Sequence, residues 1–444
     1  MISSERIISV GLIDTAREVR GSFNGNFELP SSIKLQGSFR ITKKDGRLVL
    51  YDNKEVVVLR SEELCCRPLN GATFTLNNVT IGLNFHWERK EKQTFEGDLT
   101  IHGNAGDTFS VINKIHAERY LQSVISSEMS AEAPIELLKA HAITSRSWLV
   151  AMLEHQEKLN KKRIRPRLPA ETENEIIRWY DREDHAFFDV CADDHCQRYQ
   201  GISKIISNSV KEAIETTRGI FLVAGNELCD ARFSKACGGR TELFENCWEE
   251  TAVPYLQSVS DSSVNSSPIL DESDAEHWIF SSPDVYCNST DGKMLRHVLP
   301  SFDQETSDFF RWKVEYSRVQ LEEILYLKSG IDFGTVMDIV PLKRGASGRI
   351  VQLKIIGSKR SMIVGKELEI RRWLSKSHLY SSAFIVKIER DAGGLPKNFA
   401  FHGAGWGHGV GLCQIGAAVM ASKGFTAVEI VRHYFRGAEL KKLY

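Results

Sequence analysis

The chain has 444 residues, of which 42% are hydrophobic and 26% are charged, and its formal net charge is −1. These values are ordinary for a soluble globular protein, and the length favours two or three domains over one core. Lysine and arginine (57 residues) nearly balance aspartate and glutamate (58 residues). This balance excludes the strong overall field of a protein that binds nucleic acid or an anionic membrane through bulk charge.

The N-terminal sequence MISSERIISVGLID has no apolar core of signal-peptide length, and no stretch reaches about 18 apolar residues. We therefore expect no transmembrane segment, and any export signal is not visible in this sequence. Nine cysteines cannot all pair within one chain, so they do not indicate a complete disulfide framework. A Cys237–Cys247 bridge is one option among several.

Residues 5–112 are predicted to be β-rich. The stretch SIKLQGSFRITKKDGRLVLYDNKEVVVL alternates apolar and polar residues, and Asp45-Gly46 between two such runs is a strong signal for a tight hairpin turn. The stretch FTLNNVTIGLNFHW continues the pattern.

From residue 114 the apolar period becomes helical, in KIHAERYLQSVISSEM and in PIELLKAHAITSRSWLVAMLEHQEKL. Pro134 suits the first turn of the second helix. Residues 161–200 are polar and irregular, and a further helix is expected near 207–217.

The C-terminal half is predicted to mix loops, helices and short strands. Serine-rich 258–274 indicates a loop, followed by a helical part around 300–330 and by strands at 349–357 and 383–388. Two short helices should close the chain, the last one opened by a capping box in TAVE at 426–429.

The predicted fold class is therefore α+β, with a β-rich N-terminal region followed by a mixed α/β region. Four segments follow from this organisation. They are 1–112 (β-rich), 113–260 (helical, with a His/Cys loop), 261–340 (loop and helical insertion) and 341–444 (β/α, ending in a glycine-rich motif).

The first candidate for chemistry is a group of charges at the junction of the two central helices. Glu128 closes the first helix, and Lys139 and Arg146 lie seven residues apart on the second, so that the two cations share a face. Such a group is either a set of solvated surface charges or a binding and catalytic site.

The second candidate is HAFFDVCADDHC, which brings His185, Cys191 and Cys196 within twelve residues, with His195 adjacent. Thiolate and imidazole suit Zn²⁺, and either water or His195 would complete a tetrahedron. The spacing is not the CxxC of common zinc modules, so free cysteines in a loop are the alternative. A structural role is favoured, because the surrounding segment has no core of its own.

Two further segments are rich in glycine. In ARFSKACGGRTELFENCW, the polar group Ser234, Gly239, Thr241 and Glu242 includes a glycine pair that either forms a turn or brings backbone amides to a ligand. In FHGAGWGHGVGLCQIG, at 401–416, every second residue from 403 to 411 is glycine. Glycine costs about 0.5–1 kcal/mol relative to alanine inside a strand or helix, so this repeat requires close packing against protein or against a ligand.

Together these segments resemble one family. AERYLQSVISSEMSAEAPIELLKAHAITSRSW, RFSKACGGRTE and GWGHGVGLCQIGAAVMASKGFTAVEIVRHYF are similar, in order and spacing, to the stage II sporulation protein D family, which includes the LytB amidase enhancers. The resemblance covers about 113–260 and about 340–444. It implies a peptidoglycan lytic transglycosylase that cleaves the MurNAc–GlcNAc bond of strands freed of stem peptides.

The resemblance also implies roles for individual residues. These are Glu128 as acid and base, His185, Cys191 and Cys196 as the zinc-type loop, and three substrate-binding residues: Lys139 and Arg146 at the matching helix positions and Tyr199 beside the metal loop. Ser234, Gly239, Thr241 and Glu242 are also expected to bind the substrate.

The implied mechanism needs one carboxyl group. Glu128 would protonate the glycosidic oxygen and then accept the proton of the MurNAc 6-hydroxyl, which closes on C1. Arg146, with Lys139, would face the lactyl carboxylate that removal of the stem peptide exposes, because an arginine fork suits a carboxylate. Trp406 would offer an aromatic face to a sugar ring, and His408 or Gln414 would supply hydrogen bonds.

The expected partners are peptidoglycan glycan strands and a cell-wall amidase, the expected location is the cell envelope, and the expected cofactor is a structural zinc with no organic group. Two other functions stay open. One is a non-catalytic enhancer that activates a partner amidase, and the other is a zinc hydrolase built on His185, Cys191 and Cys196.

Overall fold

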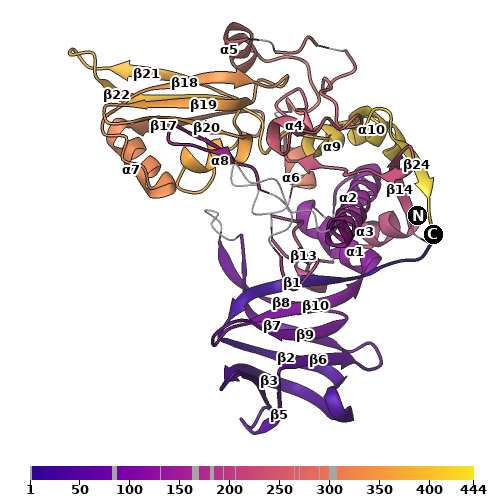
Figure 1. Ribbon diagram of the computed structural model, residues 1–444. Coiled ribbons are helices and arrows are strands. Elements are labelled where there is room, and N and C mark those ends of the chain that lie inside the picture. The colour runs from indigo at the N-terminus through magenta and orange to yellow at the C-terminus, as the bar shows by residue number, and fades with distance from the viewer. Residues whose placement is uncertain are drawn as a thin grey trace. The chain divides into compact units, whose positions relative to one another are not determined.

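The computed structural model describes residues 3–82, 88–130, 132–162, 170–180, 185–193, 195–205, 207–264, 266–269, 271–289, 291–299 and 308–444. The chain forms two compact units that alternate along the sequence (Figure 1). Unit 1 comprises Met1–Glu132, Arg182–Ile220 and Lys442–Tyr444, and unit 2 comprises Ala133–Asp181 and Phe221–Lys441.

Unit 1 is built on an eleven-stranded sheet. Nine strands follow the order β13-β1-β10-β9-β6-β2-β3-β4-β5, and the other two extend it, because β7 pairs with β2 and β8 pairs with β7. The strands are β1 (Ile7–Ala16), β2 (Glu18–Glu28), β3 (Lys34–Lys44), β4 (Arg47–Tyr51), β5 (Val57–Ser61), β6 (Glu63–Pro68), β7 (Thr73–Ile81), β8 (Arg89–Phe95), β9 (Asp98–Gly103), β10 (Phe109–His116) and β13 (Val190–Cys191). Asp45 and Gly46 join β3 to β4 with φ of 51° and 75°, as a type I′ turn requires. The predicted β-rich region and its hairpin are confirmed.

Aromatic rings fill the buried side of this sheet. Phe23 stacks on both Phe27 and Phe39 with centroids 4.4 Å apart, and Phe74 stacks on Phe95 at 5.3 Å. These five side chains are almost fully buried. Aromatic side chains bury large apolar areas, so this cluster is a main source of the unit's stability.

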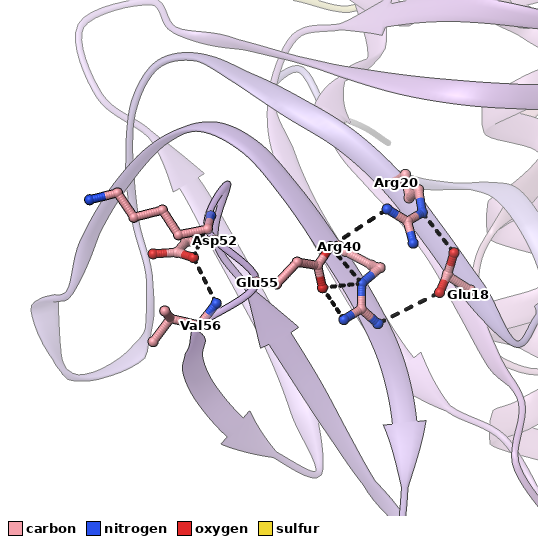
Figure 2. Close-up of polar contacts among 7 residues, drawn as sticks. Glu18, Arg20, Arg40, Asp52, Glu55 and Val56 are labelled. Atoms are coloured by element: carbon pink, nitrogen blue, oxygen red, sulfur yellow. Dashed lines mark hydrogen bonds and ion pairs between the residues drawn. The ribbon is translucent and has the colours of Figure 1, made fainter.

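Charged side chains line another part of the same strands, as Figure 2 shows. Arg40 Nε lies 2.7 Å from Glu55 Oε2, and Arg20 Nε lies 2.8 Å from Glu18 Oε1. Arg20 and Arg40 are directly opposite each other on β2 and β3, so the two glutamates offset a like-charge pair. Exposed ion pairs of this kind contribute little to stability, and the group marks a surface that faces water.

The described part of unit 1 also contains four short helical segments. They are a 3₁₀ helix (Pro30–Ser32), α1 (Ala117–Glu128), a second 3₁₀ helix (Gly201–Lys204) and α3 (Asn208–Thr216). α1 follows β10 without a loop and ends at Glu128, and α3 is capped by the Ser207 side chain, which accepts from Ser209 N. Both helices are therefore where the sequence predicted them.

Unit 2 begins with α2 (Ile135–Lys162), whose first residue follows Pro134. It contains a five-stranded sheet, β11-β12-β20-β19-β18, a three-stranded sheet, β17-β22-β21, a pair, β16-β23, and the sheet β15-β14-β24, of which Ile220 and Lys442 belong to unit 1. The strands are β11 (Ala170–Glu171), β12 (Glu175–Ile177), β14 (Ile220–Ala224), β15 (Glu227–Leu228), β16 (Phe233–Ser234), β17 (Arg311–Ser317), β18 (Val336–Arg344), β19 (Ile350–Gly357), β20 (Ser361–Gly365), β21 (Phe384–Arg390), β22 (Pro396–Ala404), β23 (Leu412–Cys413) and β24 (Glu439–Lys442).

The other helices of unit 2 are α4 (Phe244–Cys247), α5 (Glu272–Phe280), α6 (Gly292–Val298), α7 (Arg318–Ser329), α8 (Glu367–Trp373), α9 (Gln414–Ser422) and α10 (Ala427–Tyr434). The two predicted C-terminal helices are α9 and α10, and Thr426 and Glu429 form the predicted capping box. The predicted strands at 349–357 and 383–388 are β19 and β21. The α+β class is confirmed.

The prediction of a helical part around 300–330 is wrong in its middle. Residues 300–307 lie outside the described residues, Arg311–Ser317 is strand β17, and helix α7 starts only at Arg318. The segment WKVEYS alternates, and it pairs along its whole length with β22, where Trp312 stands opposite Gly403. Sheet pairing therefore outweighs helix propensity here.

In unit 2 one large buried cluster includes Trp312, Phe384 and Phe401 from the β17-β22-β21 sheet and Trp373 from α8. Among the described residues, no helix is both long and apolar enough to cross a bilayer.

Candidate functional site

Glu128 is the last residue of α1 in unit 1, and its side chain is only 7% exposed. The helix is held in place by its buried apolar face, which includes Tyr120, Leu121 and Val124. Glu128 Oε1 accepts a hydrogen bond from the backbone N–H of Arg198 at 3.0 Å. One carboxyl oxygen is thus fixed by a backbone donor from a segment seventy residues further along the chain.

The segment that carries this donor directly follows the predicted metal loop. His185, Cys191, His195 and Cys196 each offer a ligand atom, and these four atoms lie within 4.8 Å of one another. Cys196 Sγ lies 3.3 Å from His185 Nε2 and 3.5 Å from His195 Nδ1. A tetrahedral zinc with ordinary Zn–S and Zn–N lengths needs a separation of about 3.6 Å between sulfur and nitrogen ligands. The residues therefore fit the ion, with His195 as the fourth ligand.

The electrostatics of the loop also suit a metal. Hydrogen bonding with Cys196, His185 and His195 lowers the pKa of the Cys191 thiol far below its ordinary value, against the opposing effect of burial. Zinc binds the thiolate and not the thiol. The Cys196 sulfur accepts from the Cys191 N–H at 3.4 Å, which orients it toward the centre of the group.

The fold anchors this loop on both sides. On one side, Cys191 lies in β13, which pairs in parallel with β1 at Gly11. A side chain at Gly11 would overlap the Phe188 ring, so glycine is needed for this approach. On the other side, Gln200 N donates to Ser123 Oγ of α1 at 3.1 Å. Strand pairing with β1 and this hydrogen bond to α1 therefore hold the loop in place within unit 1.

Tyr199 is buried next to these contacts and does not lie on the surface. It is 1% exposed, its hydroxyl donates to Asn113 Oδ1 at 2.6 Å, and its ring stacks on Tyr120 at 5.1 Å. Burial raises the pKa of its hydroxyl. These contacts give Tyr199 a packing role, so its predicted contact with substrate has no support in its position.

The two predicted cations lie on α2, in unit 2. Lys139 Nζ pairs with Glu136 Oε1 at 2.8 Å, and the other oxygen of Glu136 accepts from Ala427 N at 2.7 Å. Arg146 is fully buried. Lys139 is thus engaged within the helical part of unit 2, and both substrate contacts stay predictions.

The glycine repeat of unit 2 is explained by close packing within the protein. Gly405, Gly407, Gly409 and Gly411 all have φ between 73° and 95°, which L side chains rarely adopt. A side chain at Gly409 would overlap the Arg349 guanidinium, and one at Gly405 would lie 2.7 Å from the carbonyl oxygen of Ala236. The predicted contact of these glycines with a glycan is therefore not needed to explain the repeat.

Arg349 is the residue around which this segment is organised, and no sequence motif indicated this role. The side chain is 1% exposed and donates to the Gly407 carbonyl (2.9 Å), the Cys237 carbonyl (3.0 Å) and Ser347 Oγ (3.0 Å). Ser347 Oγ in turn donates to Glu242 Oε2 at 2.6 Å. A buried network thus links the glycine repeat to Glu242.

Glu242 and Thr241 are both fully buried, and their side chains bond within the protein. Besides Ser347, the Glu242 carboxylate accepts from Leu243 N and Asn246 Nδ2, each at 2.8 Å. Thr241 Oγ1 donates to the Gln257 carbonyl at 2.9 Å and accepts from Val259 N at 2.8 Å. Their positions indicate structural roles.

Ser234 and Gly239 differ in how well their surroundings explain them. Gly239 has φ of 108° and leaves no room for a side chain beside the Trp278 ring, so it forms a packed turn. The Ser234 hydroxyl is buried and has no hydrogen-bond partner within the described part of the chain. Since an unpaired buried hydroxyl is costly, Ser234 is the member of this group that remains a candidate for a bound ligand or water.

Trp406 and His408 are the side chains of the glycine repeat that keep some exposure. Trp406 lies against Phe309 and edge-on to Tyr380, with centroids 4.6 and 4.8 Å away. His408 Nδ1 accepts from Val410 N at 3.0 Å, and burial, with Arg232 and Arg349 nearby, lowers the pKa of His408 well below its usual value. His408 is thus neutral near pH 7, suited to hydrogen bonding and not to proton donation as an imidazolium.

Gln414, the third residue predicted to bind a sugar, is only 1% exposed, and its Nε2 lies 2.9 Å from His141 Nε2 of α2. The cysteines nearby are not bridged. All nine cysteines are free, and Cys247 Sγ contacts the His408 carbonyl at 3.6 Å, so the Cys237–Cys247 option is wrong.

Comparison with known proteins supports the resemblance found in the sequence. Residues 105–223 match the family model described as "Stage II sporulation protein", and residues 242–411 match a "Domain of unknown function (DUF8618)". The chain is 25% identical to stage II sporulation protein D of Bacillus amyloliquefaciens (74% of this chain, 76% of the relative) and 23% identical to that of Bacillus subtilis (74% and 76%). It is 27% identical to an uncharacterized protein of Brachyspira hyodysenteriae (75% and 69%). The predicted resemblance to the stage II sporulation protein D family is confirmed.

Replacing Gly409 by alanine tests the packing of the glycine repeat. Gly409→Ala should lower the free energy of unfolding by more than Gly424→Ala does. Gly424 also has positive φ but has nothing within 4 Å of an added side chain. The control should lose about 1–2 kcal/mol from backbone strain alone, while Gly409→Ala must also displace Arg349. Urea unfolding followed by tryptophan fluorescence measures both, and equal losses would contradict the packing account.

Replacing Cys196 by serine tests the metal loop. Cys196→Ser should remove one equivalent of zinc from the purified chain, because the sulfur at the centre of the group is lost. Cys65→Ser, which changes a partly exposed cysteine of unit 1 outside the loop, should leave the zinc content unchanged. Elemental analysis measures both proteins, and an unchanged metal content in Cys196→Ser would show that the loop holds no ion.

Proposed function

We propose that this chain, which carries a stage II sporulation protein domain at residues 105–223, is a peptidoglycan lytic transglycosylase with Glu128 as its acid and base. Similarity to stage II sporulation proteins supports a peptidoglycan-related function in sporulation. The observation that carries the finer proposal is the buried carboxyl group of Glu128, within the matched domain, with one oxygen held by Arg198 N–H.

The chemistry requires a single carboxyl group. Protonated Glu128 gives its proton to the glycosidic oxygen, the bond between MurNAc C1 and that oxygen breaks, and GlcNAc leaves with a free 4-hydroxyl. The MurNAc 6-hydroxyl then bonds to C1 while its proton passes to Glu128, which closes a 1,6-anhydro ring and restores the acid. A hydrolase of the common types would instead need a second carboxylate to activate water or to attack the sugar.

The hydrogen bond from Arg198 N–H holds Glu128 Oε1 as an acceptor and so fixes the position of the carboxyl group. A fixed donor geometry matters here, because general acid catalysis depends on holding the proton within hydrogen-bond reach of the leaving oxygen.

Zinc in the His/Cys loop would serve this site as a structural link. The ion would join His185, Cys191, His195 and Cys196, and the chain reaches Arg198 two residues after the last of them. When bound, it supplies a rigid cross-link. Four protein ligands form a closed set of the kind found in structural zinc sites, which argues against a zinc hydrolase.

The substrate in this proposal is the glycan strand of peptidoglycan, and the place of action is the cell envelope, where that polymer lies. A cell-wall amidase, which removes stem peptides, is the proposed partner. A non-catalytic enhancer of such an amidase is the alternative function. The retained, buried Glu128 favours catalysis over it.

Glu128→Gln should lower the rate of formation of 1,6-anhydroMurNAc ends from peptide-free glycan by about 10²–10⁴-fold, because the amide can neither give nor take the proton. Mass spectrometry of the digest measures these ends. The matched control is Glu132→Gln, which changes an exposed carboxylate at the same helix junction and should keep the wild-type rate.

Two results would contradict the assignment. One is a Glu128→Gln variant that forms anhydro ends at the wild-type rate. The other is a wild-type protein that binds glycan, forms no anhydro ends and accelerates a partner amidase, which would establish the enhancer function instead.

We propose that Arg146 determines the preference for peptide-free strands. Its guanidinium fork would bind the lactyl carboxylate of MurNAc, which is exposed only when the stem peptide is absent. Arg146→Ala should reduce the rate on peptide-free glycan by about 10–100-fold more than the rate on peptide-bearing glycan, as expected for loss of a hydrogen bond to a charged group. Arg146→Lys should keep the charge and lose most of the preference, because lysine has no fork.

The ratio of the two rates is the measurement, because a fully buried arginine also contributes to folding. Circular dichroism checks that each variant is folded. An equal loss on both substrates would assign Arg146 to structure alone.

A further inference from the structure

A second group of metal-ligating side chains lies in unit 2, apart from the His/Cys loop of unit 1. Cys237, Asp261, Cys287 and Cys413 each offer one ligand atom, and the four atoms lie within 4.8 Å of one another. The side chains are 0–2% exposed. They come from four separated segments: the turn after β16, the loop that begins after Ser260, which forms an isolated β-bridge with Arg240, the turn before α6, and the end of β23.

The spacing of the sulfurs matches a mononuclear ion. Cys237 Sγ and Cys287 Sγ are 3.7 Å apart. A disulfide would bring them to about 2.05 Å. Two thiolates on one tetrahedral zinc, with Zn–S of about 2.3 Å, lie about 3.8 Å apart. The observed separation is that of two ligands sharing an ion.

Backbone donors support the sulfur ligands as they do in metal centres. Cys413 Sγ accepts from Cys237 N at 3.2 Å and from Gly416 N at 3.4 Å, and Cys237 Sγ accepts from Gly239 N at 3.4 Å. Hydrogen bonds from the next shell orient ligands and stabilise negative sulfur. The turn at 237–239 and the start of α9 thus present their N–H groups to the cluster.

The carboxylate is oriented in the same way. Asp261 Oδ1 accepts from Tyr434 Oη at 2.5 Å, and Asp261 Oδ2 accepts from Cys287 N at 2.8 Å. Each oxygen receives one of these bonds, so lone pairs remain for a metal. A side chain at Gly416 would overlap both Asp261 and the Tyr434 hydroxyl, so glycine is required for α9 to approach the carboxylate.

A buried aspartate needs polar partners. Asp261 is fully buried, and in the ranges that the structure describes its carboxyl group bonds to Tyr434 Oη and Cys287 N and forms no ion pair with a lysine, arginine or histidine. Burying an aspartate in this way is costly. Buried free cysteines are common as small apolar residues, but that reading does not account for an aspartate among three of them. A divalent cation accounts for all four.

We propose that Cys237, Asp261, Cys287 and Cys413 bind a second zinc ion, with a structural role in unit 2. Three sulfurs and one carboxylate oxygen form a closed tetrahedral set, buried from water, with no open position for a substrate. The ion fastens the end of the glycine repeat, through Cys413, to the turn at Cys237 and to the Asp261 and Cys287 loops. This site does not depend on the proposed transglycosylase reaction.

The full-length chain, purified without chelator, should contain two zinc ions by elemental analysis and by native mass spectrometry. Cys287→Ser and Asp261→Asn should each contain one. Cys196→Ser should also contain one, and the Cys196→Ser/Cys287→Ser double variant none. Cys229→Ser and Cys247→Ser, which change buried cysteines outside both groups, are the matched controls and should keep two.

The proposal is overturned if wild type holds a single zinc that Cys196→Ser removes, if Cys287→Ser and Asp261→Asn keep both ions, or if peptide mapping finds a Cys237–Cys287 disulfide. The wild-type mass and peptide map decide the question even if the variants fail to fold. Two zinc ions in the native mass, with all nine cysteines alkylated after unfolding in chelator, would support it.

Discussion

The hydrogen bond from Arg198 N–H to the Glu128 carboxylate is the interaction on which the proposed site depends. A carboxyl group at a helix end can point in several directions, and this bond selects one. The bond exists because the chain leaves the His/Cys loop two residues earlier and then runs along α1. The loop thus supports the proposed catalytic glutamate through its position, and the proposal does not require any of its ligands to touch the substrate.

The position of the glycine repeat is also set by contacts with distant segments of the chain. Its backbone is positioned by an internal arginine, Arg349, and by the network through Ser347 to Glu242. The strong sequence signal therefore marks a place where the protein packs against itself. This packing leaves Trp406 and His408 partly exposed, and these two side chains of the repeat stay candidates for contact with a ligand.

Much of the fold could be predicted because local patterns decide it. The Asp45-Gly46 turn, the end of α1 at Glu128 and the Thr426–Glu429 capping box each depend on a few neighbouring residues. Contacts between distant segments could not be predicted in this way. Nothing local in the sequence links Asp261 to Cys413, or Arg349 to Gly407, and strand β17 was missed because its pairing with β22 lies far along the chain. Of the candidate site, the glutamate and the metal loop came from short motifs, whereas the bond that joins them came only from the structure.

The most direct test of the central claim is to digest peptide-free glycan with the wild-type protein in water labelled with ¹⁸O. If Glu128 gives its proton to the glycosidic oxygen and then accepts the proton of the MurNAc 6-hydroxyl, the new ends are 1,6-anhydro sugars that contain no label. New reducing ends that carry ¹⁸O would mean that water attacks C1, and the account of Glu128 as the sole acid and base would be wrong.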